Sequence, residues 1–175
     1  PFFPIGTETV YAGYALTPSE EENVFKGLKT IHGNSMAIPV HWDAIEPEEG
    51  KYDFSSVDRL IANARKYDLK LILLWFGTWK NGAMDYVPVW IKSDTKRFPR
   101  VLDYGGRPIR VLSPHGQATL EADRRAFTEL MKHIKEIDGN DHTVILMQVE
   151  NESGVLGSPR DYSPESNKLF NGPVP

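Results

Sequence analysis

The stretch Leu69-Lys70-Leu71-Ile72-Leu73-Leu74-Trp75-Phe76 is a nearly continuous apolar run of strand length. A second run of the same kind is Thr143-Val144-Ile145-Leu146-Met147-Gln148-Val149. Apolar residues fill successive positions in both runs instead of alternating with polar ones, and this pattern is typical of strands that are covered on both faces. The two runs therefore predict strands of a parallel sheet.

Helical patterns alternate with these strands. Thr17-Pro18-Ser19-Glu20 predicts a helix start, because Thr can cap the helix, Pro suits the first helical position and Glu completes a capping box. Ser55 opens a second helix, and a third extends from about Thr119 to Asp138. Two further strands are predicted at 2–8 and 36–42. The alternation of strands and helices indicates an α/β fold with a parallel sheet.

One connection, from Gly77 to about Ala118, is far longer than an ordinary strand-to-helix loop. It predicts a short turn at Pro88–Ile91 and a hairpin around Tyr104-Gly105-Gly106-Arg107, where two glycines suit a tight turn. Long loops at the carboxyl ends of parallel strands are usually functional. No internal repeat or low-complexity linker divides the sequence, so residues 1–175 are interpreted as a single domain.

Composition excludes several classes of protein. The 175 residues include 24 acidic and 20 basic side chains, giving a net charge of −4, and there is no cysteine. This balance gives no electrostatic footprint for nucleic acid or anionic lipid, and no apolar run approaches the ~18 residues of a membrane span. The five histidines lack metal-ligand spacing, so neither a metal nor another cofactor is expected. No signal peptide is visible, and the cellular location stays open.

The most specific signal is Gln148-Val149-Glu150-Asn151-Glu152, which closes the last predicted strand. Two carboxylates and an amide are costly to place at the end of a buried strand. In (β/α) barrels this end carries the catalytic groups. The plain alternative is that both glutamates point into solvent beyond the strand.

This motif resembles the acid/base motif of clan A retaining glycoside hydrolases, especially the β-galactosidases of family 35 and, more distantly, family 42. Trp42–Ser55 resembles the family's segment after the second strand, and Trp75–Gly82 is similar to a segment of family 35-like bacterial proteins. Other stretches that recur in those proteins are Pro88, Trp90, Arg97–Arg100 and Arg160–Ser163. The resemblance implies a retaining glycosidase with a carbohydrate substrate, a β-linked galactoside or related β-glycoside. Relatives of this type are often secreted or periplasmic.

The resemblance also implies a role for each residue of the motif. Glu152 would be the general acid that protonates the leaving oxygen and then the base that activates water. Asn151 would hydrogen-bond the sugar 2-hydroxyl, a contact that strengthens in the transition state. Glu150 would support the site or bind a hydroxyl. The chemistry requires that the pKa of Glu152 be raised, so that the carboxyl is protonated at working pH.

Aromatic and polar residues near the other strand ends are candidates for sugar contacts. Trp42, Trp75 and Trp79 could stack on sugar faces or pack in the core, and Trp79-Lys80-Asn81 is favoured because a bulky ring lies beside two polar donors. Glu8 ends the first predicted strand, where related enzymes have a glutamate; alternatively it is a solvated carboxylate. His41 could line the cleft.

Taken with the length of the sequence, the resemblance implies half of a (β/α)8 TIM barrel: about four parallel βα units with a long loop after strand 3. A closed barrel needs roughly 200–250 residues. A retaining enzyme needs a second carboxylate ~5–5.5 Å from the first, and the resemblance places that nucleophile at strand 7, beyond these units. A non-catalytic carbohydrate-binding module, or an inactive truncated half-barrel, is therefore the competing interpretation.

A half-barrel has two open edges with unpaired backbone groups, and the apolar runs 69–76 and 144–149 would be partly uncovered. The expected remedy is a homodimer in which two copies pair edge to edge. The second carboxylate would then be recruited locally or across the interface, with Glu8, Glu150 and Asp43 as candidates in that order. An unrelated esterase would need a G-x-S-x-G motif, which the sequence lacks.

Overall fold

A computed structural model describes residues 2–9 and 16–173. Its elements, in chain order, are β1 (Gly6–Glu8), α1 (Pro18–Thr30), β2 (Ser35–His41), α2 (Trp42–Ile45), α3 (Ser55–Lys66), β3 (Lys70–Lys80), α4 (Val89–Ser93), β4 (Arg100–Leu102), β5 (Pro108–Leu112), α5 (Gln117–Asp138), β6 (Val144–Asn151) and α6 (Pro164–Phe170). Within the described ranges, no helix combines the length and the apolar character that crossing a bilayer requires.

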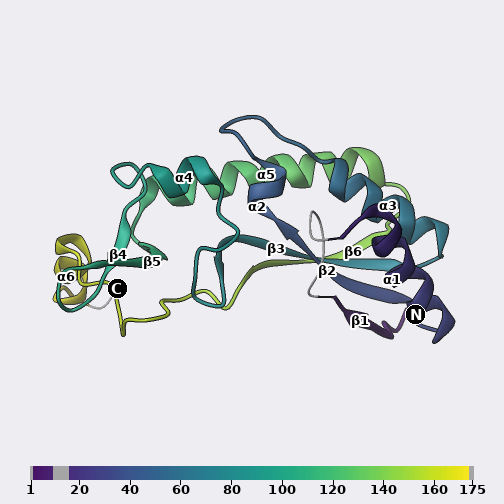
Figure 1. The fold of residues 1–175 in the computed structure, drawn as a ribbon, viewed down its shortest axis with the longest axis horizontal. Coiled ribbons are helices and arrows are strands. Elements are labelled where there is room, and N and C mark those ends of the chain that lie inside the picture. Colours follow the sequence, from purple (N-terminus) through teal and green to yellow (C-terminus); the bar gives the residue numbers. More distant parts are fainter. Residues whose placement is uncertain (1, 10–15, 174–175) are drawn as a thin grey trace.

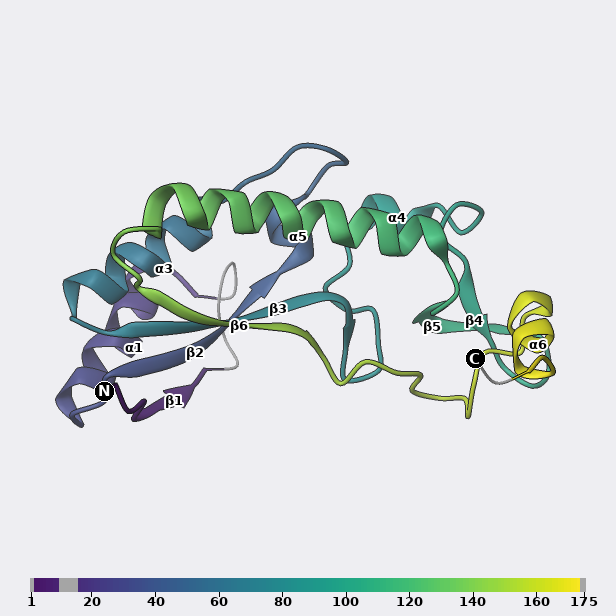
Figure 2. The same ribbon diagram turned by 180° about the vertical axis from the view of Figure 1, so that it is seen from behind.

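The described strands β1, β2, β3 and β6 form one parallel sheet in that order, and β4 and β5 form a separate antiparallel pair. Helices α3 and α5 lie side by side over one face of the sheet (Figures 1 and 2). The order of the strands and their parallel pairing confirm the predicted α/β fold with four parallel βα units. The carboxyl ends of β3 and β6 are therefore neighbours.

The core lies between the sheet and its helices. Its largest fully buried side chains include Phe25 of α1, Trp42 of α2 and Trp75 of β3. Helix α1 begins as predicted: the backbone N–H of Glu20 donates to the Thr17 hydroxyl (3.3 Å), and that of Thr17 donates to the Glu20 carboxylate (2.8 Å). These reciprocal bonds satisfy donors that a helix start leaves unpaired.

The two apolar runs differ in their surroundings. β3 lies between β2 and β6 and is almost wholly buried, so the expectation that its run would be partly uncovered is wrong. β6 is an edge of the described sheet, and its side chains Ile145, Leu146 and Val149 are 41%, 53% and 60% exposed. The prediction that β6 is covered on both faces is therefore wrong for the described residues, whereas an open β6 edge was expected.

The long connection after β3 carries its own structure, as predicted. The strand itself continues to Lys80, the predicted turn is the short helix α4, and the predicted hairpin is the β4–β5 pair. Gly106 adopts a positive φ of 75° in the hairpin turn, a conformation that glycine adopts without steric cost. At the end of the connection, α5 crosses back over the carboxyl ends of β3 and β6 (Figure 2).

Candidate active site

The carboxyl ends of β3 and β6 are joined through a bulge. Trp75 pairs with Val149 and Lys80 pairs with Asn151, so four residues of β3, Phe76–Trp79, lie opposite the single residue Glu150. Extra residues on one strand bend it and re-aim its side chains. We call Phe76–Trp79 the β3 bulge.

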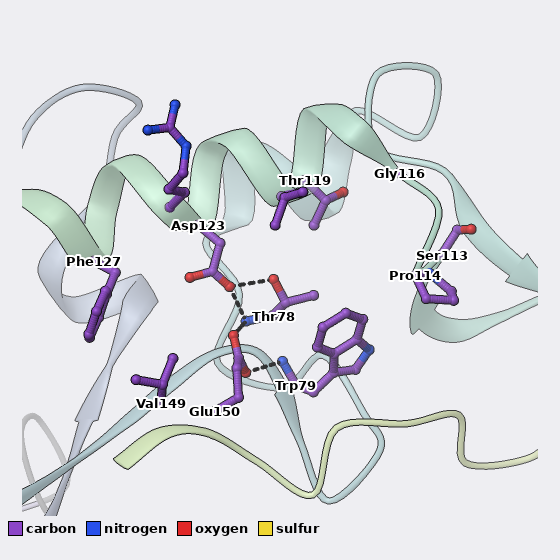
Figure 3. A pocket seen from close by; sticks show the side chains of 12 residues that line it. Thr78, Trp79, Ser113, Pro114, Gly116, Thr119, Asp123, Phe127, Val149 and Glu150 are labelled. Atoms are coloured by element: carbon purple, nitrogen blue, oxygen red, sulfur yellow. Dashed lines mark hydrogen bonds between the residues drawn. The ribbon is translucent and has the colours of Figure 1, made fainter. Parts of the chain in front are cut away.

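Two carboxyl groups, those of Asp123 and Glu150, lie within the curve of the β3 bulge (Figure 3). The backbone N–H groups of Thr78 and Trp79 each donate to a different oxygen of Glu150, both at 2.9 Å. The Thr78 N–H also donates to Oδ2 of Asp123 (2.8 Å), which accepts the Thr78 hydroxyl as well. Oδ1 of Asp123 accepts from the indole Nε1 of Trp75 at 2.9 Å. We call Asp123 and Glu150 the carboxyl pair.

Burial raises the pKa of Glu150 to about 9, and the hydrogen bond and negative charge of Asp123 act in the same direction. The N–H groups of Trp79 and Thr78 oppose this shift without cancelling it. Glu150 therefore keeps its proton at neutral pH. A glycosidase nucleophile must be ionised, so Glu150 is unsuited to that role, and both its oxygens already accept backbone hydrogen bonds.

Beside the carboxyl pair, the structure brings together four of the predicted site residues. Nζ of Lys80 donates to Oδ1 of Asn151 at 2.6 Å, and the backbone N–H of Asn81 donates to the carbonyl of Asn151 at 3.2 Å. The carbonyl of Glu152 accepts from the N–H of Gly82 at 3.0 Å, while the Glu152 side chain is exposed to solvent.

The backbone around Asn151 adopts unusual conformations. Glu150 and Glu152, on either side of Asn151, have φ values of 63° and 51°, and Asn81 opposite them has a φ of 55°. Side-chain-bearing residues rarely occupy this left-handed region, and such conformations cluster at functional sites, where surrounding contacts maintain them. The strand end that carries the motif is therefore a constrained one.

A cavity of about 310 Å³ lies between α5 and the ends of β3 and β6. Trp79, Thr119, Phe127 and Val149 contribute to its walls, together with the carboxyl pair (Figure 3). Within the described part of the chain, Nε1 of Trp79 and Oγ1 of Thr119 are buried without a hydrogen-bond partner. Trp79 as a whole is half-buried and lines the cavity.

Two of the predicted aromatic candidates belong to the core. Trp42 is fully buried, its Nε1 donates to Oε2 of Glu46 at 2.9 Å, and its ring packs against Trp75 and Trp90. The prediction that Trp42 contacts a sugar is therefore wrong for this structure, because no face of its ring is accessible. Trp75 is also fully buried, and its indole Nε1 donates to Oδ1 of Asp123.

The strand register places Glu8 far from the motif. Glu8 is exposed and pairs with Ala37, which pairs with Ile72, which in turn pairs with Leu146. Asn151 lies five residues beyond Leu146 along β6, a distance of roughly 16 Å at ~3.3 Å per residue. The prediction that Glu8 supplies a second carboxylate locally is therefore wrong.

The remaining candidates on β2 and α2 lie elsewhere. His41 is buried and stacks on Tyr86 with ring centroids 4.0 Å apart, and burial lowers its pKa to about 4, so the ring is neutral. Asp43 lines a separate hollow with Asp53 and Arg59. Across residues 2–9 and 16–173, no cluster of three or more potential ligands could hold a metal ion.

Asp123 is the site residue that the sequence interpretation missed. Its side chain lies on the buried face of α5, which also contains Ala122, Ala126 and Leu130. A carboxylate among the apolar residues of a buried helix face is costly unless it is hydrogen-bonded, and this is the signal that could have identified it.

The parallel sheet and the helices that cover one face define part of a (β/α) barrel, and the polar residues at the carboxyl ends of β3 and β6 lie at the end where such barrels carry their sites. Within that class, the chain belongs to glycoside hydrolase family 42. The family's model, described as β-galactosidase, matches residues 17–172.

Curated relatives agree with the family. β-Galactosidase GalA of Bacillus licheniformis is 27% identical over 135 residues, which cover 74% of this chain and 18% of the relative. β-Galactosidase-1-like protein 3 of Homo sapiens is 29% identical over 149 residues, which cover 82% of this chain and 21% of the relative. The chain therefore spans about a fifth of the length of these relatives.

Among solved structures, the exo-β-1,4-mannosidase Op5Man5 from Opitutaceae bacterium strain TAV5 has the same fold. The two superpose with a TM-score of 0.62 at 16% sequence identity, over 86% of this chain and 25% of that one. This likeness confirms the partial TIM barrel.

Proposed function

We propose that the chain supplies the acid/base half of a retaining glycosidase site that acts on β-linked galactosides or related β-glycosides. The observation that carries the proposal is the Asn151-Glu152 pair at the carboxyl end of β6 in a family 42 chain. In the first step Glu152 gives its proton to the glycosidic oxygen as the leaving group departs. In the second step it takes a proton from the water that releases the sugar.

Asn151 is proposed to bind the sugar 2-hydroxyl. Lys80 already donates to its Oδ1 at 2.6 Å, so the Nδ2 group is the part of the amide that remains to donate to a hydroxyl. Trp79 precedes Lys80 at the end of β3 and Asn81 follows it, and both are proposed as further sugar contacts.

The nucleophile is proposed to come from outside the described residues of one copy. Glu150 keeps its proton, and Glu8 lies too far along the sheet. Two sources are compatible with the resemblance: strand 7 of a longer chain, or a second copy that pairs along the open β6 edge in a homodimer. Sedimentation that finds a stable, well-folded monomer at micromolar concentration would reject the homodimer.

The test of the proposed function is hydrolysis of a panel of aryl β-glycosides, with the β-galactoside first. Glu152→Gln should abolish turnover and leave the circular dichroism spectrum unchanged, because the amide cannot give up a proton. Glu49→Gln, the same substitution at an exposed ion pair with Arg97, is the matched control and should retain activity. Full activity of Glu152→Gln would refute the acid/base assignment.

A second candidate function is carbohydrate binding without hydrolysis. It is favoured by the half-buried Trp79 ring at the wall of the cavity and by the lack of a suitable second carboxylate at Glu8 or Glu150. Calorimetric titration with galactose separates the two functions: heat of binding without any turnover on the panel would support the binding module.

A further inference from the structure

The β3 bulge leaves no space for a side chain at Gly77. A Cβ atom there would lie 2.4 Å from Nε1 of Trp75, 2.6 Å from Oδ2 of Asp123 and 2.6 Å from Oε1 of Glu150. Three polar atoms from β3, α5 and β6 thus converge on one glycine. The bulge is shaped around the carboxyl pair.

The hydrogen bonds of the pair connect all three elements. The carboxylate of Asp123 on α5 accepts hydrogen bonds from the Trp75 indole, the Thr78 N–H and the Thr78 hydroxyl. The carboxyl group of Glu150 on β6 accepts hydrogen bonds from the backbone N–H groups of Thr78 and Trp79. Removing either carboxyl would leave buried backbone donors of the bulge with fewer acceptors, which costs free energy.

Glu150 is also the first residue of the constrained strand end. Its φ of 63° places it in the left-handed region, and its carbonyl accepts from Nε2 of Gln148 at 3.0 Å. A conformation of this kind costs of order 1–3 kcal/mol and persists because its surroundings determine it. The two bonds from the bulge to the Glu150 carboxyl are contacts that can maintain it.

We propose that Asp123 and Glu150 are positioning residues: their hydrogen-bonded carboxyl pair fixes the β3 bulge against β6, and so sets Lys80 against Asn151 beside Glu152. The proposal rests on the proposed function for its catalytic consequence. Neither residue touches the substrate in this role, because their oxygens are occupied by β3 and Asp123 is buried on the inner face of α5.

The chain of contacts from the pair to the motif is short. The bulge ends at Trp79, and the next residue, Lys80, donates to Oδ1 of Asn151 at 2.6 Å. If the bulge relaxes, Lys80 moves and the Asn151 amide loses the partner that orients it. Displacements of about 1 Å in an active site can cost about 100-fold in rate.

The experiment compares Glu150→Ala, Glu150→Gln and Thr78→Val with wild type and the Glu49→Gln control. The first readout is amide hydrogen exchange of residues 76–82, which needs no activity. We expect at least a tenfold loss of protection in Glu150→Ala, confined to 76–82 and 150–152. We expect a smaller loss in Glu150→Gln, because the amide can donate to Asp123 and still accept one backbone bond.

The second readout is kcat and KM on the aryl β-galactoside. We expect kcat to fall about 100-fold in Glu150→Ala, with partial rescue in Glu150→Gln and a change in KM below about threefold. A merely structural role would lower thermal stability and leave kcat per folded molecule unchanged, and that result would overturn the proposal.

Two further outcomes are decisive. If wild type turns over no glycoside, as is expected when the nucleophile is not supplied, the exchange pattern alone decides the positioning role: unchanged protection in 76–82 overturns it. If Glu150→Ala does not fold, Thr78→Val takes its place, because it removes the hydroxyl bond to Asp123 and keeps the side-chain shape. Wild-type exchange and kcat in a folded Thr78→Val would overturn the proposal.

Discussion

The protonated Glu150 predicts an unusual dependence of stability on pH. Its pKa is about 9 in the folded chain, against an ordinary value of 4.5 that the unfolded chain restores. Between these values the folded state holds a proton that the unfolded state releases. The stability that the folded state gains from holding this proton is therefore fully present below pH 4.5, and it is lost as the pH rises through about 9.

The magnitude follows from the proton count. One proton corresponds to roughly 1.4 kcal/mol of unfolding free energy per pH unit, so between pH 6 and pH 8 wild type should lose about 3 kcal/mol relative to Glu150→Gln, which cannot ionise. Urea denaturation followed by tryptophan fluorescence at pH 6, 7 and 8 measures both slopes.

The control is again Glu49→Gln. The hydrogen bond with Arg97 lowers the pKa of the exposed Glu49, so this carboxyl is ionised in both states above pH 6 and its replacement should leave the wild-type slope unchanged. Parallel stability curves for wild type and Glu150→Gln between pH 6 and pH 8 would refute the assignment of a proton to Glu150.

Three further substitutions test the packing of the β3 bulge and the open edge of the sheet. Trp75→Phe should lower the unfolding free energy by about 1–3 kcal/mol in urea titrations, because Oδ1 of Asp123 loses its indole donor while staying buried; an unchanged midpoint would contradict this. Gly77→Ala should cost at least about 1–3 kcal/mol in the same assay, since its Cβ meets the carboxyl pair; a stability equal to wild type would show that the bulge is less confined. Leu146→Lys, on the exposed edge strand, should shift any dimer to monomer in sedimentation at unchanged thermal midpoint; a persisting dimer would place the interface elsewhere.

The fold was predictable wherever a local pattern determines the element. The capping box at Thr17 and Glu20 and the apolar run of β3 are signals within a few residues, and the structure confirms both. The exposure of β6 was not predictable from its own residues, because Ile145 and Leu146 are as apolar as their counterparts in β3. Whether such side chains are covered depends on the neighbouring strand, which is a property of the tertiary structure.

The site was predictable in part for the same reason. Asn151 and Glu152 belong to one contiguous motif, and Lys80 was identified by its polar character beside a tryptophan. Asp123 lies 27 residues before Glu150 on a helix, and no local spacing relates the two. The β3 bulge escaped prediction because its length is determined by side chains of two other elements.

The two parts of the site differ in how much they depend on neighbouring structure. The carboxyl pair is complete within β3, α5 and β6, and every hydrogen bond that shapes the bulge comes from these elements. Retaining hydrolysis needs a second, ionised carboxylate, and Glu150 cannot supply it. A strand added along β6 would cover Val149 and remove more water from the neighbouring Glu150, which would strengthen the positioning bonds. Exchange protection at Thr78 and Trp79 should therefore be present in this chain alone and rise when the open edge is covered, whereas turnover should require that covering. Protection that appears only together with turnover would show that the bulge, too, depends on the missing neighbour.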